Sequence, residues 1–238
     1  MLTSTERMIA NKAGPIGWMQ FNNPARHNAV SIDMWKAVPE IMTDFANDDP
    51  IRAVVFSGSG GRAFISGADI SEFAEKRSSR EHVVEYDRIA GLANAAIIDF
   101  QKPTIAMIQG YCLGGGLGVA LCCDLRLAAE TSSFAVPAAK LGLGYAYDGI
   151  KRPVDIVGPS FAKEIFYTAR QFNSTEALQM GLVNRVVPSA DLEASVRDSS
   201  PTIGGPAPRT INSVHSTGNH ATKDPTSGNP HRAAAPPA

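Results

Sequence analysis

Cysteine is scarce in this chain, and its three residues lie outside any metal-binding pattern. Cys112, Cys122 and Cys123 stand in apolar surroundings of a 238-residue sequence. They do not have the paired spacing of a zinc site, and they cannot build the disulfide framework of a small secreted domain. We therefore interpret them as reduced core thiols of a cytoplasmic protein that binds no metal.

Charge imbalance and long apolar runs are also missing. The 22 basic and 23 acidic residues give a net charge of −1, which offers no basic surface for nucleic acid or for an anionic membrane. No apolar run is long enough to cross a bilayer, and no charged-then-apolar secretion signal opens the chain. The 44% hydrophobic content suffices for a substantial core. These features predict a globular domain with no nucleic-acid or membrane partner.

Two glycine-dependent turns follow apolar, strand-like runs. The first turn, residues 64–69 (FISGAD), comes after a predicted strand at 52–58. The second turn, residues 114–116 (GGG), comes after a predicted strand at 103–110 and before an apolar stretch that suits a buried helix. Glycine lacks the Cβ that would keep a ligand away from the backbone. The second turn is not a P-loop, because no Lys-Ser/Thr follows it, and the chain has no G-x-S-x-G elbow around its serines.

Both turns can present free backbone N–H groups where a helix begins. If the two turns are aimed at one point, they form an oxyanion hole, which stabilises the negative charge that develops on a thioester carbonyl during enolisation. A tight strand-to-helix turn without a ligand is the alternative interpretation of the triple glycine. Asp69, at the end of the first turn, is typical of a helix cap when taken alone.

The two turns and three further segments resemble the crotonase, or enoyl-CoA hydratase/isomerase, superfamily. In chain order the segments are residues 23–29 (NPARHNA), 62–70 (RAFISGADI), 108–116 (IQGYCLGGG), 123–126 (CDLR) and 180–187 (MGLVNRVV). The resemblance covers about residues 8–198. It implies an α/β fold of the ClpP/crotonase type, a superhelix of repeated ββα turns. It also implies a CoA thioester as ligand, with no permanently bound cofactor, and a homotrimer or a dimer of trimers.

The resemblance assigns roles to individual residues. The backbone N–H groups of Ala68 and Gly115 would bind the thioester oxygen, and Ala68 would also border the CoA. Arg26 and His27 fall in the segment that holds the CoA nucleotide. Arg62 replaces a family lysine near the phosphates and keeps its charge, with a planar fork that suits phosphate. The alternative for both arginines is an ordinary solvated surface charge.

The carboxylates expected beside the hole are absent. In the hydratases of this family, one glutamate lies two positions beyond the third glycine, and a second follows a proline about twenty residues later. The corresponding positions here are Gly118 and Ala138. Neither residue can position or activate water, so the two-glutamate mechanism of hydration is not supported.

Substitute acid–base groups are few. Asp148 is the single carboxylate in residues 141–149, a segment that overlies the acyl pocket in the family, and a buried Asp there could serve as a base. The alternative, which we favour, is that Tyr147, Asp148 and Gly149 form an ordinary turn. Glu72 and His82 are further candidates that we expect to face solvent.

Two classes of function fit these observations. One is an enzyme that acts on an acyl- or enoyl-CoA through an enolate, as a hydratase-like lyase or an isomerase. The other is a catalytically silent CoA-thioester-binding or assembly protein. We expect an enzyme, working by a route other than the two-glutamate mechanism.

The composition changes after residue 198. Residues 199–238 hold seven of the sixteen prolines, whereas the last Phe is Phe172 and the last Leu is Leu192. Such a segment can bury little apolar surface. We therefore expect a crotonase-like domain over residues 1–198, a degenerate or disordered segment over 199–238, and a correspondingly weakened trimer.

Local signals predict further elements. In chain order they are a strand at 17–21, a helix capped by Ser31 and kinked at Pro39, a helix at 83–100, a strand at 125–129, a helix at 159–167, a helix with an Asn173/Glu176 capping box ended by Gly181, and a strand at 182–187.

Overall fold

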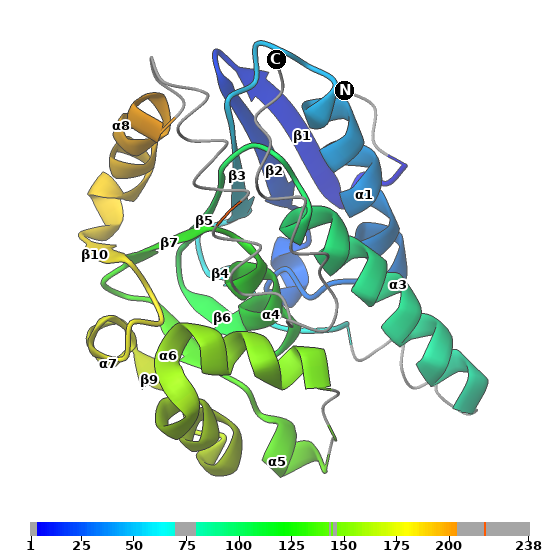
Figure 1. Cartoon of the computed structure of the whole chain (residues 1–238), viewed down its shortest axis with the longest axis vertical. Coiled ribbons are helices and arrows are strands. Elements are labelled where there is room, and N and C mark those ends of the chain that lie inside the picture. Colours follow the sequence, from blue (N-terminus) through cyan, green and yellow to red (C-terminus); the bar gives the residue numbers. More distant parts are fainter. Residues whose placement is uncertain (1–3, 70–79, 143, 145–146, 204–216, 218–238) are drawn as a thin grey trace.

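The computed structural model describes residues 4–69, 80–142, 144, 147–203 and 217, which form strands in two sheets with helices around them (Figure 1). The strands are β1 (Met8–Ala13), β2 (Ile16–Phe21), β3 (Ala53–Gly58), β4 (Ala63–Ile65), β5 (Thr104–Ile108), β6 (Tyr111–Leu113), β7 (Leu125–Ala129), β8 (Ser133–Ala135), β9 (Phe172–Asn173) and β10 (Arg185–Val187). The helices are α1 (Ile32–Ala46), α3 (Arg80–Ile98), α4 (Gly115–Cys122), α5 (Ala138–Leu141), α6 (Tyr147–Thr168), α7 (Ser174–Gln179) and α8 (Leu192–Ile203), with short 3-10 turns η1 (Pro24–Arg26) and η2 (Ser189–Asp191).

Three consecutive pairs of strands repeat one arrangement. The larger sheet has the order β1-β2-β3-β5-β7-β10, and the smaller sheet has the order β4-β6-β8-β9. Strands β3, β5 and β7 are parallel neighbours in the larger sheet, while β4, β6 and β8 are parallel neighbours in the smaller one. Each pair thus gives one strand to each sheet before the chain continues to the next pair. This repeat confirms the expected α/β superhelix of the crotonase type.

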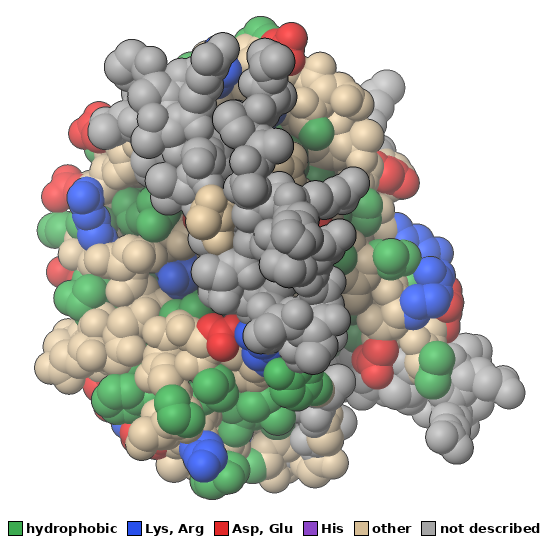
Figure 2. Space-filling view, viewed as in Figure 1, with side chains coloured by type: hydrophobic (Ala, Val, Ile, Leu, Met, Phe, Trp, Pro, Cys, Tyr) green, Lys and Arg blue, Asp and Glu red, His purple; other side chains and the backbone are tan. Residues whose placement is uncertain are grey.

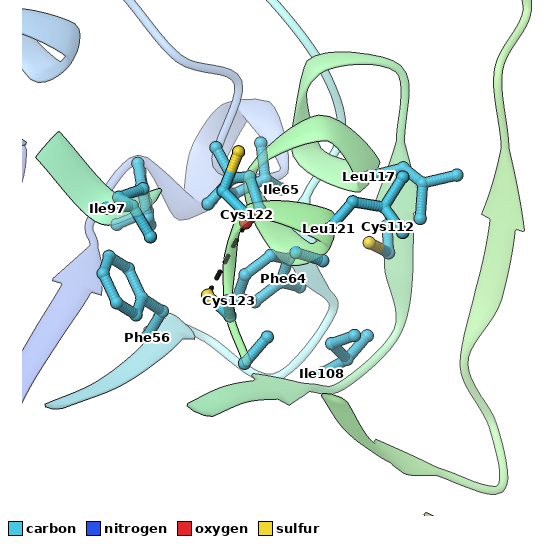
Figure 3. Packing of buried hydrophobic residues seen from close by; sticks show 14 of the residues in the cluster. Phe56, Phe64, Ile65, Ile97, Ile108, Cys112, Leu117, Leu121, Cys122 and Cys123 are labelled. Atoms are coloured by element: carbon cyan, nitrogen blue, oxygen red, sulfur yellow. Dashed lines mark hydrogen bonds between the residues drawn. The ribbon is translucent and has the colours of Figure 1, made fainter. Parts of the chain in front are cut away.

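The larger sheet separates two groups of buried side chains. Val54 and Phe56 of β3 belong to a large cluster that includes α1, α3 and α4, whereas Val55 belongs to a smaller cluster with Leu192 and Val196 of α8. This alternation is the period of two that a strand buried on both faces requires. Figure 3 shows part of the large cluster, with the three cysteines among Phe56, Phe64 and Leu121.

Most of the predicted elements are confirmed. The strands expected at 17–21, 52–58, 103–110 and 125–129 correspond to β2, β3, β5 and β7, and the helix expected at 83–100 corresponds to α3. The capping box of α7 is also confirmed, because the Glu176 amide donates to Asn173 Oδ1 and the Asn173 amide donates to Glu176 Oε2, each at 2.9 Å. Helix α1 begins after Ser31 and continues through Pro39, but the Ser31 hydroxyl donates to Asp33 instead of accepting from a helix amide.

Two local predictions need correction. The turn expected at Tyr147, Asp148 and Gly149 is wrong, because these residues form the first turn of α6. The helix expected from Pro159 is the second half of α6, which breaks at Gly158 (φ 76°, ψ 165°). Proline disfavours helical backbone at the residue before it, and glycine readily adopts the positive φ found there.

The end of the domain also differs from expectation in detail. The strand expected at 182–187 covers only Arg185–Val187, because the amides of Leu182 and Val183 donate back to Ala177 O in the turn after α7. The domain boundary expected after residue 198 stays a prediction, and residue 198 lies within α8. Apart from residue 217, the expectation for residues 204–238 lies outside the described residues.

Candidate functional site

The two glycine turns lie side by side, at the ends of neighbouring parallel strands. Strand β4 pairs with β6, with Ile65 opposite Cys112, and each turn follows its strand. A Cβ placed on Gly67 would lie 3.6 Å from the carbonyl oxygen of Leu113, and a Cβ on Gly114 would lie 3.9 Å from the Cα of Gly67. The sheet register therefore brings into contact two turns that are separated by almost fifty residues in the sequence.

Gly116 allows helix α4 to approach strand β4. A Cβ on Gly116 would lie 2.2 Å from the carbonyl oxygen of Ile65 and 2.6 Å from the Ile65 Cβ, which is closer than real side chains come. Gly114, just before the helix, has φ 52° and ψ −117°, a conformation that residues with a Cβ rarely adopt. Packing of one turn on the other thus requires glycine at both positions, whether or not a ligand binds.

The backbone N–H groups of Ala68 and Gly115 donate to no acceptor among the described residues. On either side of Ala68 the backbone is paired with Val30, whose amide donates to Gly67 O at 2.8 Å and whose carbonyl accepts from the Asp69 amide at 3.0 Å. Gly115 is the first residue of α4, where amides have no acceptor within the helix. Both residues are partly exposed. The structure therefore places the two proposed oxyanion donors on adjacent turns with their N–H groups unused.

Asn28 holds the loop after β2 against the loop before β4. Its side chain is fully buried, accepts from the Asn23 amide at 2.9 Å, and donates to the carbonyl oxygens of Ser59 at 2.9 Å and Ala63 at 2.8 Å. Its φ of 57° lies in the left-handed region, which Asn tolerates better than most residues. A single buried amide thus fixes three segments near the first turn.

Arg26 contacts the first turn directly. Its Nη1 lies 2.9 Å from Oδ1 of Asp69, whose side chain is 4% exposed against 54% for Arg26. The Ser66 hydroxyl donates to Arg26 O at 3.3 Å, and the Ser66 amide donates to His27 O at 3.1 Å. Arg26 is therefore engaged by the residue that follows Ala68, in addition to lying in the segment expected to hold the CoA nucleotide.

His27 and Arg62 lie at the same end of the smaller sheet. Both are exposed. The His27 ring packs edge-on against Tyr111, with ring centroids 5.9 Å apart, and the Tyr111 amide donates to Arg62 O at 3.2 Å. Tyr111, at the start of β6, thus contacts both His27 and Arg62, two predicted ligand-binding residues that are distant in the sequence.

Gly118 and Ala138, the positions at which the resemblance leads us to expect glutamate, flank the second turn. Gly118 lies three residues after Gly115 on α4 and so on the same helix face. A Cβ on Gly118 would have no described atom within 4 Å. Ala138 is buried at the start of α5, directly after Pro137, whose Cδ lies 4.0 Å from the Cβ position of Gly114. The structure therefore brings both positions to the second turn.

The three candidate substitutes are less defined. Asp148 lies in the first turn of α6 and His82 lies in α3, but the side chains of both are outside the described residues. Glu72 is outside them altogether.

Trp35 is a neighbour of the second turn that sequence reasoning did not assign to the site. Its Cζ2 lies 3.7 Å from the Cβ position of Gly115, the residue is 3% exposed, and its Nε1 donates to Tyr86 Oη of α3 at 2.9 Å. Trp35 belongs to the buried face of α1, together with Met34, Val38 and Phe45. No signal in the sequence shows that this part of the core adjoins the glycine turn.

The cysteines surround α4 without forming a reactive site. All three are free and buried. Burial raises the pKa of the Cys122 thiol to about 11 and also raises the pKa values of Cys112 and Cys123. Among the described residues, no three His, Cys, Asp or Glu side chains are grouped to hold a metal ion, and no helix has both the length and the apolar character needed to span a membrane.

Comparison with known proteins gives one consistent result. The sequence matches the model of the enoyl-CoA hydratase/isomerase family over residues 11–230. It is similar to the crotonyl-CoA hydratase of Syntrophomonas wolfei, at 33% identity over 192 residues, covering 81% of this chain and 73% of the relative. It is also similar to the short-chain-enoyl-CoA hydratase of Clostridium acetobutylicum, at 32% identity over 204 residues, covering 84% of this chain and 76% of the relative.

Solved structures agree with the sequence comparison. The fold is similar to that of an enoyl-CoA hydratase/carnithine racemase from Magnetospirillum magneticum, with a TM-score of 0.89 and 32% identity, covering 93% of this chain and 83% of the other. An enoyl-CoA hydratase from Bacillus anthracis matches with a TM-score of 0.87 and 26% identity, covering 93% of this chain and 86% of the other.

Proposed function

The chain belongs to the enoyl-CoA hydratase/isomerase family, and we propose that it is an enzyme that binds an acyl- or enoyl-CoA thioester and stabilises its enolate. The observation that carries this proposal is the pair of unused N–H groups at Ala68 and Gly115, on two turns in contact. Two preorganised donors aimed at a thioester oxygen stabilise the charge that develops there in the transition state. The N-terminal end of α4 adds the positive end of a helix dipole at the same place.

The rest of the ligand has matching groups nearby. Arg62 and His27 are exposed, and we expect them to contact the CoA phosphates and nucleotide, while Arg26 can share its guanidinium between a phosphate and Asp69. Coenzyme A enters as part of the substrate, so the reaction needs no permanently bound cofactor. A homotrimer or a dimer of trimers in the cytoplasm completes the proposal.

The acid–base chemistry differs from two-glutamate hydration. Gly118 and Ala138 bring no proton donor or acceptor to the second turn, and a positioned general acid or base is typically worth about 10²- to 10⁴-fold in rate. We therefore expect hydration of crotonyl-CoA to be very weak. Asp148 is the residue we propose as a substitute base. The same two positions favour a second candidate function, a catalytically silent protein that binds CoA thioesters.

Binding and turnover separate these functions. Calorimetry with CoA, acetyl-CoA and crotonyl-CoA is expected to show saturable binding, and its absence from folded protein would refute a CoA-thioester site. Turnover of a panel of acyl- and enoyl-CoAs then distinguishes an enzyme from a silent binder. Replacing both Gly118→Glu and Ala138→Glu is expected to raise the hydration rate, since Gly118 faces open space.

A matched pair of variants tests the oxyanion donor itself. Gly115→Pro removes one N–H at the first position of a helix, where proline is tolerated, whereas Gly115→Ala keeps the N–H and adds a Cβ at an ordinary 3.7 Å from Trp35. We expect the proline variant to lose about 10²- to 10³-fold in turnover of whichever substrate the panel identifies, and the alanine variant to lose much less. Equal activity of both variants would exclude the Gly115 amide as a donor.

A further inference from the structure

Arg126 is a buried cation whose guanidinium donates to backbone carbonyls. Its side chain lies on β7 and is 6% exposed, with Nε donating to Leu182 O and Nη1 donating to Cys123 O, each at 2.8 Å. Among the described residues Arg126 forms no ion pair with a carboxylate, although the charge of Asp124 acts on it from nearby. Burying a guanidinium with neutral partners is costly, and the cost lowers the pKa of Arg126. The fold therefore keeps Arg126 buried although its hydrogen-bond acceptors, the carbonyls of Leu182 and Cys123, are neutral.

The acceptor at Cys123 connects Arg126 to the proposed site. Cys123 is the C-terminal cap of α4, and Gly115 is the first residue of the same helix. Arg152 of α6 reaches this end too, since its Nη1 donates to Leu121 O at 3.4 Å. Two guanidinium groups thus meet the negative end of the helix whose positive end carries the proposed oxyanion donor. The neighbouring carboxylate of Asp124 accepts from the amide and hydroxyl of Thr104 on β5, at 2.7 and 2.8 Å.

Arg126 also ties this end of α4 to the last strand of the larger sheet. The Arg126 amide donates to Asn184 Oδ1 and its carbonyl accepts from the Asn184 amide, both at 2.8 Å, just before β10. With the Leu182 contact, Arg126 therefore clamps the C-terminal end of α4 to the segment after α7. The helix has eight residues and is about 12 Å long, so a shift at Cys123 is transmitted to Gly115.

We propose that Arg126 is a positioning residue for the oxyanion hole: it fixes the C-terminal end of α4 and complements its dipole, and so aims and strengthens the Gly115 N–H. This inference rests on the proposed function. It predicts that Arg126, at the C-terminal end of α4, affects the polarisation of a thioester carbonyl bound at the N-terminal end.

The test combines one ligand-bound and one ligand-free measurement on the full chain. Three variants are compared with wild type: Arg126→Met removes the charge and both hydrogen bonds, Arg126→Lys keeps the charge, and Arg152→Met weakens the same helix end at a less buried position. Arg88→Met is the matched control, because Arg88 is exposed on α3 and pairs with Glu85. Difference infrared spectroscopy with a ¹³C-labelled thioester carbonyl of butyryl-CoA reports polarisation, and hydrogen–deuterium exchange of residues 113–119 reports the position of α4 without ligand.

We expect Arg126→Met to lose about half or more of the carbonyl downshift while the affinity for butyryl-CoA changes by less than about threefold. Arg126→Lys and Arg152→Met should lose a smaller part of the carbonyl downshift, and Arg88→Met should retain all of it. Residues 113–119 should exchange faster in Arg126→Met than in wild type. If Arg126→Met does not fold, the carbonyl downshifts of Arg126→Lys and Arg152→Met test the inference in its place. An unchanged downshift in folded Arg126 variants overturns the inference.

Failure of the proposed function gives a different result. If folded wild-type protein binds no butyryl-CoA, the thioester site itself is refuted, and the exchange measurement alone decides whether Arg126 positions α4. Faster exchange at residues 113–119 supports that role, and unchanged exchange overturns it.

Discussion

At the scale of single residues, Asn28 shows how one buried amide organises the first turn. Both hydrogens of its Nδ2 are directed at carbonyl oxygens, of Ser59 and Ala63. Asn28→Asp keeps the shape but faces those carbonyls with a carboxylate oxygen, and we expect it to lower the free energy of unfolding by about 2–3 kcal/mol. Urea denaturation measures this loss. Asn22→Asp is the matched control, because the Asn22 side-chain contact with Glu6 O is exposed, and it should change stability by less than about 0.5 kcal/mol.

Arg26 and Asp69 form the second residue-scale test. Removing Arg26 leaves a carboxylate that is only 4% exposed without this partner, so Arg26→Ala should cost about 1–2 kcal/mol. Asp69→Asn removes the charge that Arg26 compensates, and Arg26→Ala made in that background should cost less. A double-mutant cycle by urea denaturation measures the coupling. Additive single effects, within about 0.5 kcal/mol, would show that the contact contributes nothing to stability.

The sequence predicts site residues where the backbone is special and misses those that depend on distant neighbours. Ala68 and Gly115 could be selected because glycine turns have a sequence signature and a family resemblance. The contact of Trp35 with the second turn could not, because apolar periodicity identifies the buried face of α1 but not the element packed against it. The ion pair of Arg26 with Asp69 was missed for the same reason, since the two residues are 43 positions apart.

At the scale of elements, helix α4 is surrounded by thiols that the fold keeps protonated. Cys122 belongs to the helix, Cys123 caps it, and Cys112 lies on β6 before it. All three should resist a disulfide reagent such as DTNB at pH 8 in native protein and react together after unfolding. Absorbance of the released thiolate counts them. Rapid reaction of any thiol in folded protein would contradict the burial found here.

The raised pKa values of the thiols also predict that the free energy of unfolding decreases at high pH. An unfolded Cys loses its proton near its ordinary pKa of 9.0, whereas Cys122 in the folded protein does so at about 11. The unfolded state is therefore the first to ionise. Ionisation of Cys122 should leave the free energy of unfolding unaffected below pH 9 and should lower it as the pH rises from 9 to about 11.

The capping box of α7 predicts how the stability of the protein changes at low pH. The amide of Asn173 and the guanidinium of Arg170 lower the pKa of Glu176 below its usual 4.5. A carboxylate with a lowered pKa contributes stability above its unfolded pKa and loses it as the pH falls through its folded value. The advantage of wild type over Glu176→Gln in urea denaturation should therefore be largest near neutral pH and shrink below 4.5. A pH-independent difference would assign the contribution of Glu176 to packing.

Element prediction succeeded for long segments and failed for short ones. Strands β4, β6 and β8 have three residues each, too few for an alternating pattern to be visible. They exist because each is paired with a neighbour from the next repeat, which is a property of the superhelix and not of the local sequence. The same short strands carry the site, because their ends set the positions of both turns.

At the scale of the whole molecule, the larger sheet divides the chain into a side with the proposed site and a side without it. Trp35 belongs to the cluster with α1, α3 and α4, whereas Trp18 of β2 packs against the cluster with Leu192 and Val196 of α8. The guanidinium of Arg197 lies over the Trp18 ring, 4.8 Å from its centroid. Figure 2 shows one face of the molecule, on which apolar, charged and other side chains are mixed.

The order of motifs along the chain made the overall architecture predictable, because the two glycine turns follow β4 and β6 and so mark the same point in successive repeats. The boundary expected after residue 198 rested on composition and on the extent of the family resemblance. Composition reports how much apolar surface a segment can bury but not where a helix ends, and α8 continues to Ile203 across Pro201. The repeat is a property of the whole chain, whereas a helix end depends on local contacts.

Trp35 and Trp18 lie on opposite faces of the larger sheet, so their fluorescence can report on which face a ligand binds. The Trp35 ring is adjacent to Gly115, so an enoyl thioester that places its carbonyl between Ala68 and Gly115 should change the emission of Trp35 and leave that of Trp18 nearly constant. Titration of Trp18→Phe with crotonyl-CoA should retain the fluorescence change, and titration of Trp35→Phe should abolish it while calorimetry still shows binding. The reverse result, a change that requires Trp18, would place the ligand on the α8 side of the sheet. Because the sheet lies between the two rings, that outcome could not be reconciled with a site at the paired glycine turns.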